Sequence, residues 1–262
     1  TKMISSTKNP KIQWVLRLQK KSKDRHAEQV FAIEGVRLLE DAQVSDWKII
    51  SIFYSDTLSD RGMNLVNASR KNDTQIESVS PKVMSAISDT KNPQGILAVI
   101  EMRSLPVPDQ LDFALILDQM RDPGNLGTIL RSAAAAGAQV VYLSPGTVDA
   151  FSPKVLRAGM GAHFRLPIHN ARWIDICSRI KSAELHAYLA TSEGSDTYHD
   201  SDFQRPLILI IGGEAEGASQ TAYQVADSQI KIPMPGGGES LNASVAAGIL
   251  LFEIARQKEN KK

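Results

Sequence analysis

The chain has almost no cysteine, and Cys177 is its only thiol. One cysteine excludes an intramolecular disulfide framework, a zinc site made of several cysteines and an iron–sulfur cluster held by thiolates. The histidines show no metal-ligand spacing. We therefore predict that no metal is bound and that the protein works in a reducing compartment, which we take to be the cytoplasm.

Long hydrophobic runs are also missing. No apolar stretch approaches the roughly 18–20 residues that span a bilayer, and residues 1–10, TKMISSTKNP, lack the apolar centre of a secretory signal. Neither a G-x-G-x-x-G loop nor a Walker loop with its lysine is present. The sequence thus predicts no membrane association and gives no support for a phosphate-bearing cofactor.

The composition that remains is that of an ordinary folded protein. Hydrophobic residues make up 42% and charged residues 23% of the 262 residues. The chain is therefore not depleted of apolar residues as disordered chains are. At this length we expect two domains.

Charge is unevenly distributed, although the net charge is only +1. Residues 1–25 carry eight Lys or Arg and one acidic residue, whereas the remaining residues carry 22 basic and 28 acidic ones. Such a basic segment can neutralise the phosphates of a nucleic acid. An equally acceptable interpretation is a solvated helix whose apolar side packs on the domain. The candidate phosphate contacts are Lys20, Lys21, Lys23 and Arg25, and the apolar side would consist of Ile12, Val15, Leu16 and Leu18.

Residues 30–101 alternate strand-like apolar runs with helical patterns, which predicts an α/β domain. Residues 103–112, RSLPVPDQLD, contain two prolines and no periodicity, as is typical of a linker. We therefore place a first domain at residues 1–102, a linker at 103–112 and a second domain at 113–262.

The second domain contains short apolar runs that are typical of buried parallel strands. FALILD (113–118), HAYLAT (186–191) and LILIIG (207–212) each run into a polar or glycine-rich loop. In open α/β sheets, ligands bind outside the carboxyl ends of the strands. We therefore expect these loops to form one site on a parallel sheet.

The first candidate loop lies in residues 118–133, DQMRDPGNLGTILRSA. A tight turn precedes a helix here, and we expect Asn125 to be the helix N-cap. Arg131 follows in an apolar, alanine-rich helix, where a guanidinium is costly unless it has a partner. That partner is either a ligand or a carboxylate or carbonyl group of the protein itself.

Two further loops are rich in glycine. In IIGGEAEGAS (210–219), glycines directly after a strand let backbone groups face a ligand, and two glutamates suit a cation better than an anion. A plain strand-to-helix turn is the alternative for this loop. In IPMPGGGESLNASVAAGILLFE (232–253), three successive glycines predict a sharp turn or a close approach of the backbone to another group.

These loops together resemble a known family. N-L-G-T-I-L-R, G-G-E-A-E-G and E-S-L-N-A-S-V-A occur in this order within residues 113–257. They are similar to the three motifs of the SpoU (TrmH) family of RNA ribose 2′-O-methyltransferases, in the SPOUT superfamily. SPKVLRAGMGAHFRLPI (152–168) resembles the family as well, with Lys154 and Arg157 at positions that match RNA contacts. Residues 1–102 resemble the smaller L30e-like substrate-binding domain that many members carry.

The resemblance implies a fold, a cofactor and an assembly. The fold would be an α/β parallel-sheet domain with a trefoil knot, and the protein would be a homodimer. The methyl donor would be S-adenosyl-L-methionine, a sulfonium without phosphate that is held largely by backbone groups. Positions that match donor contacts are Gly212, Ile232 and Leu241, with Thr191, Gly213, Gly217, Pro233 and Met234 as neighbours.

The resemblance also implies catalytic positions, which are Asn125, Arg131, Glu214, Ser240 and Asn242. The family's proposed catalytic residue matches Arg131. A free guanidinium keeps its proton even at about pH 12, so an arginine is a poor general base. We expect Arg131 to hold a neighbouring phosphate and to stabilise the developing alkoxide by hydrogen bonding.

The expected substrate is a structured RNA. A separate RNA-binding domain favours ribosomal RNA as the substrate, and we expect large-subunit RNA to be the target. The alternative within the family is transfer RNA. A non-catalytic RNA-binding protein on a methyltransferase scaffold is the alternative of another class. The presence of Arg131, Asn125 and Asn242 argues against that second alternative.

Overall fold

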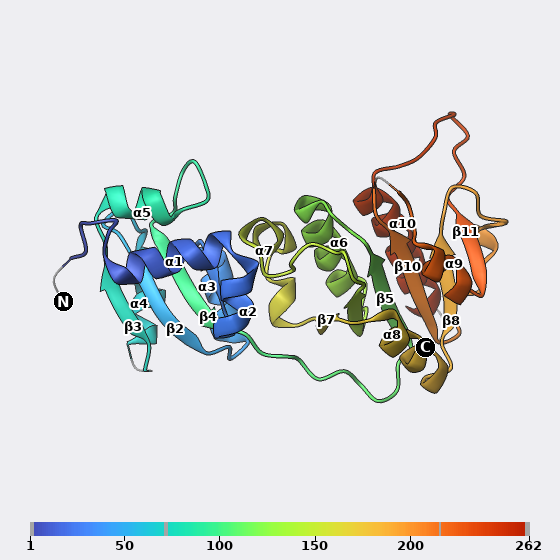
Figure 1. The fold of residues 1–262 in the computed structure, drawn as a ribbon, viewed down its shortest axis with the longest axis horizontal. Helices are drawn as coiled ribbons and strands as arrows, with labels where there is room; N and C mark the ends of the chain where they lie inside the picture. Colours follow the sequence, from blue (N-terminus) through green and yellow to red (C-terminus); the bar gives the residue numbers. More distant parts are fainter. Residues whose placement is uncertain (1–2, 71–72, 215, 260–262) are drawn as a thin grey trace. The chain divides into compact units, whose positions relative to one another are not determined.

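The computed structural model describes residues 3–70, 73–214 and 216–259 (Figure 1). It divides into two compact units. Unit 1 contains the described chain up to Arg103 together with Phe151–Phe164, and unit 2 contains Ser104–Ala150 and the chain from Arg165 onwards. Residues 151–164, from the second half of the sequence, therefore belong to unit 1. The predicted domain boundaries placed these residues in the second domain.

Unit 1 is an α/β unit. Its strands are β1 (Val30–Glu34), β2 (Ile49–Tyr54), β3 (Gln75–Ser78) and β4 (Ile96–Glu101). Its helices are α1 (Pro10–Lys20), α2 (Ser22–Glu28), α3 (Val36–Val44), α4 (Asp60–Ser69), α5 (Pro81–Ile87) and α7 (Pro153–Gly159), with the 3-10 turn η1 (Ala162–Phe164). The strands form a mixed sheet in the order β1, β4, β2, β3. Strand β4 runs antiparallel to β1 and β2, whereas β3 is parallel to β2.

The apolar side of α1 is buried in the core of unit 1. Ile12, Val15 and Leu18 have no exposed surface, and Leu16 is partly buried against the same cluster. The predicted apolar side of the basic segment is thus confirmed. The helix starts directly after Asn9, whose side chain caps it, with a proline in the first turn.

Aromatic packing explains why residues 151–164 belong to unit 1. The ring of Phe31 in β1 lies 4.9 Å from the ring of Phe151 and 6.5 Å from that of Phe164. Trp47 packs edge-on against Phe164 at 5.3 Å and donates its indole N–H to the carbonyl of Phe164 at 3.3 Å. Phe31, Trp47 and Phe164 are buried, and Phe151 is partly buried, so these aromatic contacts bring residues 151–164 into the core of unit 1.

Unit 2 is a parallel α/β unit. Its strands are β5 (Phe113–Asp118), β6 (Val140–Leu143), β7 (Ile168–Asn170), β8 (His186–Ala190), β9 (Asp196–Thr197), β10 (Leu207–Gly212) and β11 (Ser228–Lys231). Its helices are α6 (Pro123–Ala135), α8 (Trp173–Ser182), α9 (Gln220–Val225) and α10 (Ala243–Glu259), with the 3-10 turn η2 (Tyr198–Asp200). Over the described residues the strands form one sheet in the order β7, β6, β5, β10, β8, β11, β9, with parallel pairing throughout.

The sheet of unit 2 is covered on both faces. Helices α8 and α9 contribute Ile176 and Ala222 to a buried cluster with side chains of β5, β6, β8 and β10. Helix α10 packs against α6 and β10. Burial on both faces requires strands that are apolar along their whole length, which is why FALILD and LILIIG show no polar alternation. The predicted parallel sheet is confirmed.

No helix in the described ranges is long and apolar enough to cross a membrane.

Candidate active site

The loops singled out in the sequence meet at one edge of the sheet of unit 2. Strands β5, β10, β8 and β11 are consecutive neighbours, and all run in the same direction. Their carboxyl ends therefore lie side by side. Asp118 pairs with Gly212 across β5 and β10, and the N–H of Thr191 donates to the carbonyl of Ile230 at 2.9 Å.

A chain of hydrogen bonds joins one residue from each of the three motifs. The side-chain amide of Asn125 donates to Oε1 of Glu214 at 2.8 Å. Nδ2 of Asn242 donates to Oδ1 of Asn125 at 3.1 Å. In the sequence, Asn125 is 89 positions from Glu214 and 117 positions from Asn242, so only the fold brings the three residues together.

The chemistry of these groups fixes the direction of the chain. A carboxylate can only accept, so Asn125 must turn its NH₂ group towards Glu214 and its oxygen towards Asn242. The oxygen of Asn242 is engaged by the backbone N–H groups of Ser244 at 2.9 Å and Val245 at 3.3 Å, at the start of α10. Its NH₂ group is therefore directed to Asn125. Each amide has one orientation that satisfies its neighbours.

Asn125 is not the N-cap of α6, and the sequence-based prediction was wrong on this point. The N-cap is Asp122, whose carboxylate accepts from the backbone N–H of Asn125 at 2.8 Å. Pro123 then occupies the first helical position, where its missing N–H and fixed φ suit the helix. The cap at Asp122 leaves the side chain of Asn125 available for the other two motifs.

Arg131 and Ser240 lie outside this hydrogen-bonded chain. Arg131 is exposed on α6, and within the described chain its guanidinium makes no hydrogen bond or ion pair. A partner within the protein, which was one of the two alternatives, is not needed, because the side chain is exposed to solvent rather than buried. Ser240 is exposed in the loop before α10, and its hydroxyl makes no hydrogen bond to the residues that the structure describes.

Two glycines of the second motif are required by close packing of the chain on itself. A Cβ atom on Gly212 would lie 2.4 Å from the backbone nitrogen of Ala218, and one on Gly213 would lie 2.5 Å from the carbonyl oxygen of Gln119. Only glycine fits there. A Cβ atom on Gly217 would meet no other atom, and the φ of this residue is 70°. The positive φ, and not lack of space, therefore explains why a glycine stands at this position.

The three glycines of the third motif make a turn that stands clear of the protein. Gly236 and Gly237 have open space where a Cβ atom would be, and the N–H of Gly237 donates to the carbonyl of Met234 at 3.0 Å. Gly237 and Gly238 have φ values of 73° and 140°. The turn needs glycine for its backbone conformation, and its backbone groups stay accessible.

The other predicted donor-binding residues surround the same strand ends. Ile232, Pro233 and Met234 follow β11 directly, and Leu241 precedes α10. Thr191 follows β8, and its hydroxyl lies 3.3 Å from the hydroxyl of Tyr223 on α9. Sequence reasoning missed Tyr223, which is 39% exposed. Tyr223 lies in a helix of only six residues, and no pattern in the sequence indicates that it lies beside Thr191.

Comparison with known proteins decides the family. The SpoU rRNA Methylase family matches residues 112–252, and the MRM3-like substrate binding domain matches residues 9–98. The chain belongs to the SpoU rRNA methylase family. The 23S rRNA (guanosine(2553)-2′-O)-methyltransferase RlmP of Bacillus subtilis is 31% identical, over 97% of this chain and 99% of that protein.

Solved structures agree with this family. The AdoMet-bound rRNA methyltransferase of Sinorhizobium meliloti superposes with a TM-score of 0.88 at 32% identity, covering 97% of each chain. The SpoU methyltransferase AviRb of Streptomyces viridochromogenes in complex with AdoMet has a TM-score of 0.88 at 28% identity, covering 96% of this chain and 99% of that one. Both similarities extend over both units of this SpoU protein.

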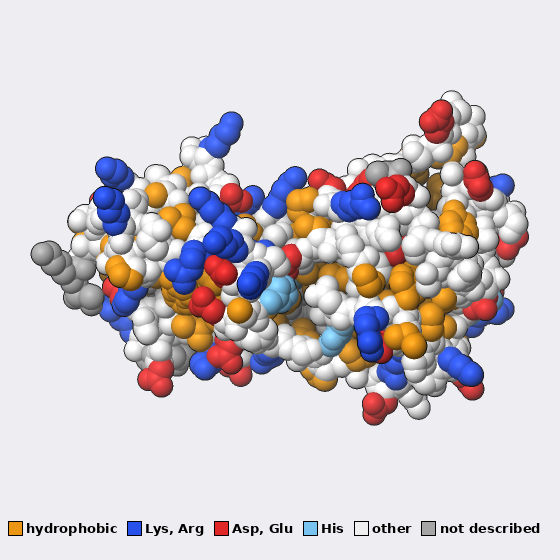
Figure 2. Space-filling view, in the orientation of Figure 1, with side chains coloured by type: hydrophobic (Ala, Val, Ile, Leu, Met, Phe, Trp, Pro, Cys, Tyr) orange, Lys and Arg blue, Asp and Glu red, His pale blue; other side chains and the backbone are white. Residues whose placement is uncertain are grey.

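The basic segment of this SpoU protein presents three lysines to solvent. Lys20, Lys21 and Lys23 are exposed, and in the described part of the chain none of them pairs with a carboxylate. Figure 2 shows Lys and Arg side chains gathered over α1 of unit 1. Lysines without intramolecular partners are free to contact phosphates.

Arg25 does not belong with these lysines, which corrects the predicted RNA-binding set. Its side chain is buried, with 3% of the residue exposed. Its guanidinium donates to the carbonyls of Leu18 at 2.6 Å and Gln19 at 3.2 Å. Arg25 thus satisfies the last carbonyl groups of α1, a role that favours a buried cation.

Lys154 and Arg157 lie on α7, which packs on β1 within unit 1. Arg157 is half-buried and forms an ion pair with Asp89 at 2.5 Å. Lys154 is exposed. Both residues therefore belong to the unit that contains the exposed lysines, rather than to the sheet that contains the three motifs.

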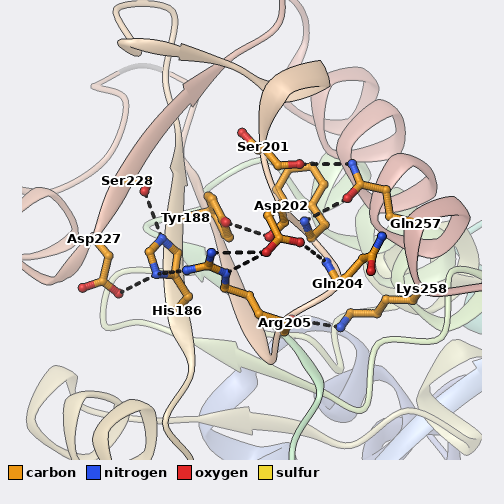
Figure 3. A network of polar contacts seen from close by, with 11 residues as sticks. His186, Tyr188, Ser201, Asp202, Gln204, Arg205, Asp227, Ser228, Gln257 and Lys258 are labelled. Carbon is orange, nitrogen blue, oxygen red and sulfur yellow. Dashed lines mark hydrogen bonds and ion pairs between the residues drawn. The ribbon is translucent and has the colours of Figure 1, made fainter. Parts of the chain in front are cut away.

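A second polar cluster lies at the opposite edge of the sheet, where β8 and β11 begin (Figure 3). His186 places Nε2 2.9 Å from the hydroxyl of Ser228, and its Nδ1 lies 3.5 Å from Nη1 of Arg205. Arg205 in turn donates to Asp202 at 3.2 Å. Burial lowers the pKa of His186, and the positive charge of Arg205 acts in the same direction, whereas Asp227 opposes it.

Proposed function

We propose that this protein transfers a methyl group from S-adenosyl-L-methionine to a ribose 2′-OH of ribosomal RNA, with large-subunit RNA as the target. The observation that carries the proposal is the hydrogen-bonded chain from Glu214 through Asn125 to Asn242. It links all three motifs of a family whose solved members bind AdoMet. The relative in Bacillus subtilis is named as a 23S rRNA 2′-O-methyltransferase.

The residues at the strand ends fit this donor. A sulfonium donor without phosphate needs backbone acceptors and hydrogen-bond donors rather than a phosphate loop. Thr191, Gly212 and Ile232 offer such backbone groups on neighbouring strand ends. Glu214 and Glu216 are exposed beside them, and carboxylates suit a cation. The donor supplies an electrophilic methyl group, and the protein supplies the positioning.

Arg131 is the residue that we assign to the RNA ribose. Its guanidinium is exposed and, among the described residues, unpaired. It can therefore donate to a phosphate and to the oxygen that gains negative charge as its proton leaves. Ser240 and Asn242, in the loop before α10 and at its start, provide further hydrogen-bonding groups for the same nucleotide. In this proposal Arg131 acts as a hydrogen-bond donor to the substrate and not as the proton acceptor.

The RNA would be held by unit 1. Lys20, Lys21, Lys23 and Lys154 are exposed there, and residues 9–98 match a family of substrate-binding domains. A separate unit that grips folded RNA favours ribosomal RNA over transfer RNA. We place the reaction in the cytoplasm, in keeping with the single thiol at Cys177.

A homodimer with a knotted C-terminal segment is part of the proposal. Helix α10 is apolar on most of its surface and leaves Val245 and Phe252 51% and 53% exposed. A second copy would cover such side chains. The knotted segment is proposed from membership of the SpoU family alone.

The experiment is transfer of a labelled methyl group. Purified protein is incubated with labelled donor and with ribosomal subunits, protein-free ribosomal RNA or transfer RNA, and the labelled nucleotide is identified by mass spectrometry. We expect label on one ribose 2′-oxygen of ribosomal RNA. Label on a base, or on transfer RNA alone, contradicts the proposal. Absence of donor binding in calorimetry would identify a non-catalytic scaffold.

A further inference from the structure

Asp118 is an acidic residue at the end of β5 that lies outside the three family motifs, although it begins the first candidate loop. It has no exposed surface. An ionised carboxylate is expensive to bury unless hydrogen bonds compensate for the loss of hydration. Asp118 receives such bonds from two loops: the hydroxyl of Ser144 donates to Oδ1 at 2.6 Å, and the backbone N–H of Ser219 donates to Oδ2 at 2.7 Å.

The bond to Ser219 closes the second-motif loop. The loop leaves the sheet at Gly212, which pairs in register with Asp118, and it enters α9 after Ser219, the N-cap of that helix. The backbone of Asp118 is therefore paired with the start of the loop, and its carboxylate accepts from the end of the loop. Between these ends the chain folds back on itself, with a bridge between Gly213 and Gly217.

The bond to Ser144 fixes the start of the first-motif loop. The hydroxyl of Ser144 that donates to Asp118 also accepts from the backbone N–H of Gln119 at 3.0 Å. Gln119 has a φ of 55°, in the left-handed region that non-glycine residues rarely adopt. Its carbonyl oxygen is the atom that a Cβ on Gly213 would meet at 2.5 Å. The first loop is thus packed backbone to backbone against the second.

Asp118 consequently sets the distance between Asn125 and Glu214. The first loop carries Asn125, the second carries Glu214, and the hydrogen bond of 2.8 Å between these side chains depends on both loop positions. A buried carboxylate with two well-directed donors is a rigid anchor for both. The geometry points to Asp118 as the positioning residue of the methyl-donor site, acting through Ser219 and Ser144 without touching the donor.

This inference rests on the proposed function, and the test compares Asp118→Ala with Asp118→Asn. The amide of Asp118→Asn can still accept from the Ser219 N–H and can donate to the hydroxyl of Ser144, so its donor affinity should stay within a few-fold of the original. Asp118→Ala removes both bonds. We expect it to bind S-adenosyl-L-methionine roughly ten- to a hundredfold more weakly in calorimetry.

Steady-state kinetics separates positioning from simple loss of folded protein. A smaller folded fraction lowers kcat and leaves both KM values unchanged. A misplaced donor loop raises the KM for the donor and leaves the KM for RNA as it was. Equal KM values for the donor in Asp118→Ala and the original protein would overturn the inference.

A second pair of variants covers the case in which Asp118→Ala does not fold. Ser219 has a φ of −68°, which a proline can adopt. Ser219→Ala removes the capping hydroxyl and keeps the N–H, whereas Ser219→Pro removes both. We expect the donor to bind more weakly to Ser219→Pro than to Ser219→Ala, and equal affinities would contradict the inference.

Amide hydrogen exchange keeps the inference separate from the proposed function. If the original protein bound no donor, the proposed function would fail, yet the anchoring could still be measured. The Ser219 amide should be protected in the free original protein and in Asp118→Asn, and it should exchange at least tenfold faster in Asp118→Ala. Unchanged protection in Asp118→Ala would remove Asp118 from this role.

Discussion

Arg131 is the residue on which the chemistry of the proposed reaction depends most. In the proposed reaction, Arg131→Ala removes the hydrogen-bond donor assigned to the developing alkoxide and leaves intact the strand ends that we propose to bind S-adenosyl-L-methionine. We expect methyl transfer to fall by roughly two to three orders of magnitude. The affinity for S-adenosyl-L-methionine in calorimetry should not change, because the exposed guanidinium makes no bond within the described chain.

Arg131→Lys is the control for charge. A lysine keeps the positive charge but lacks the planar pair of donors. If the guanidinium geometry matters, the lysine variant stays well below the original rate in the labelled-methyl assay. Full activity of Arg131→Ala would exclude this residue from the mechanism.

Asn125 shows how far a single residue can be interpreted from sequence. Its residue type and the D-P-G-N spacing correctly predicted a helix start nearby, but Asp122 is the cap. Both residue types are good caps. The side chain of Asn125 instead forms hydrogen bonds with Glu214 and Asn242, which lie far away in the sequence. Only the folded chain could settle the assignment.

At the scale of elements, we propose that the end of α1 and the start of α2 contact the RNA through their exposed lysines. Lys20→Glu, Lys21→Glu and Lys23→Glu together should weaken RNA binding. They should also reduce the slope of log affinity against log salt by roughly 0.7–0.9 for each phosphate that the variant no longer neutralises. The measurement is a filter-binding titration over a range of salt concentrations.

The matched control for this prediction is Lys181→Glu on α8 of unit 2, where the lysine is also exposed. Lys181→Glu changes the net charge as much as any one of the three lysine substitutions does, and it leaves the basic segment unaltered. If Lys181→Glu lowered RNA affinity as much as Lys20→Glu, Lys21→Glu or Lys23→Glu alone, the loss of affinity would be a general effect of charge. Unchanged RNA affinity of the triple variant at low salt would make the segment merely a solvated helix.

Arg25 illustrates why charge alone could not define this surface. It belongs to the same basic run as the three lysines, and its guanidinium is nevertheless used by the carbonyls of Leu18 and Gln19. The run changes from α1 to α2 at Lys21, and this bend directs Arg25 inward. Composition cannot distinguish a phosphate contact from a helix cap.

The second polar cluster is also an element-scale feature. Gln257 on α10 donates to the carbonyl of Ser201 at 3.2 Å and accepts from the N–H of Phe203 at 2.9 Å. Lys258 donates to the carbonyl of Arg205 at 3.1 Å (Figure 3). These bonds tie the end of α10 to the segment that follows η2. The cluster thus anchors the helix that begins directly after Asn242.

At the scale of the whole molecule, the proposed dimer makes a clear prediction. Phe252→Asp places a charge on the apolar surface of α10, and burying that charge in an interface is unfavourable. We expect a dimeric mass for the original protein and a monomeric mass for the variant in sedimentation equilibrium. Thermal unfolding of the free variant should show that it remains folded.

Ile174→Asp is the matched control for this experiment. Ile174 is 71% exposed on α8, whereas Phe252 is 53% exposed on α10. The control introduces the same charge on another apolar side chain of unit 2. It should leave the mass unchanged. A monomeric original protein, or a dimer that survives Phe252→Asp, would contradict the proposed interface.

The division of the chain into two units was only partly accessible from the sequence. The prolines of residues 103–112 predicted a linker, and the first stretch of unit 1 ends at Arg103, with unit 2 starting at Ser104. The return of residues 151–164 to that unit was not predicted. It depends on the packing of the Phe151 ring against Phe31 and of the Phe164 ring against Trp47. Such long-range packing leaves no periodic signal in the sequence.

The sequence by itself determined the class of the fold, the family and most of the residues of the proposed site. Apolar runs specify buried strands, and glycines, asparagines and capping residues specify turns, because these preferences act locally. The tertiary structure decided the rest. It showed that Asn125 joins Glu214 to Asn242, that Arg25 is buried and that Asp118 accepts hydrogen bonds from Ser144 and Ser219. These facts depend on contacts between distant segments, and only the folded chain creates those contacts.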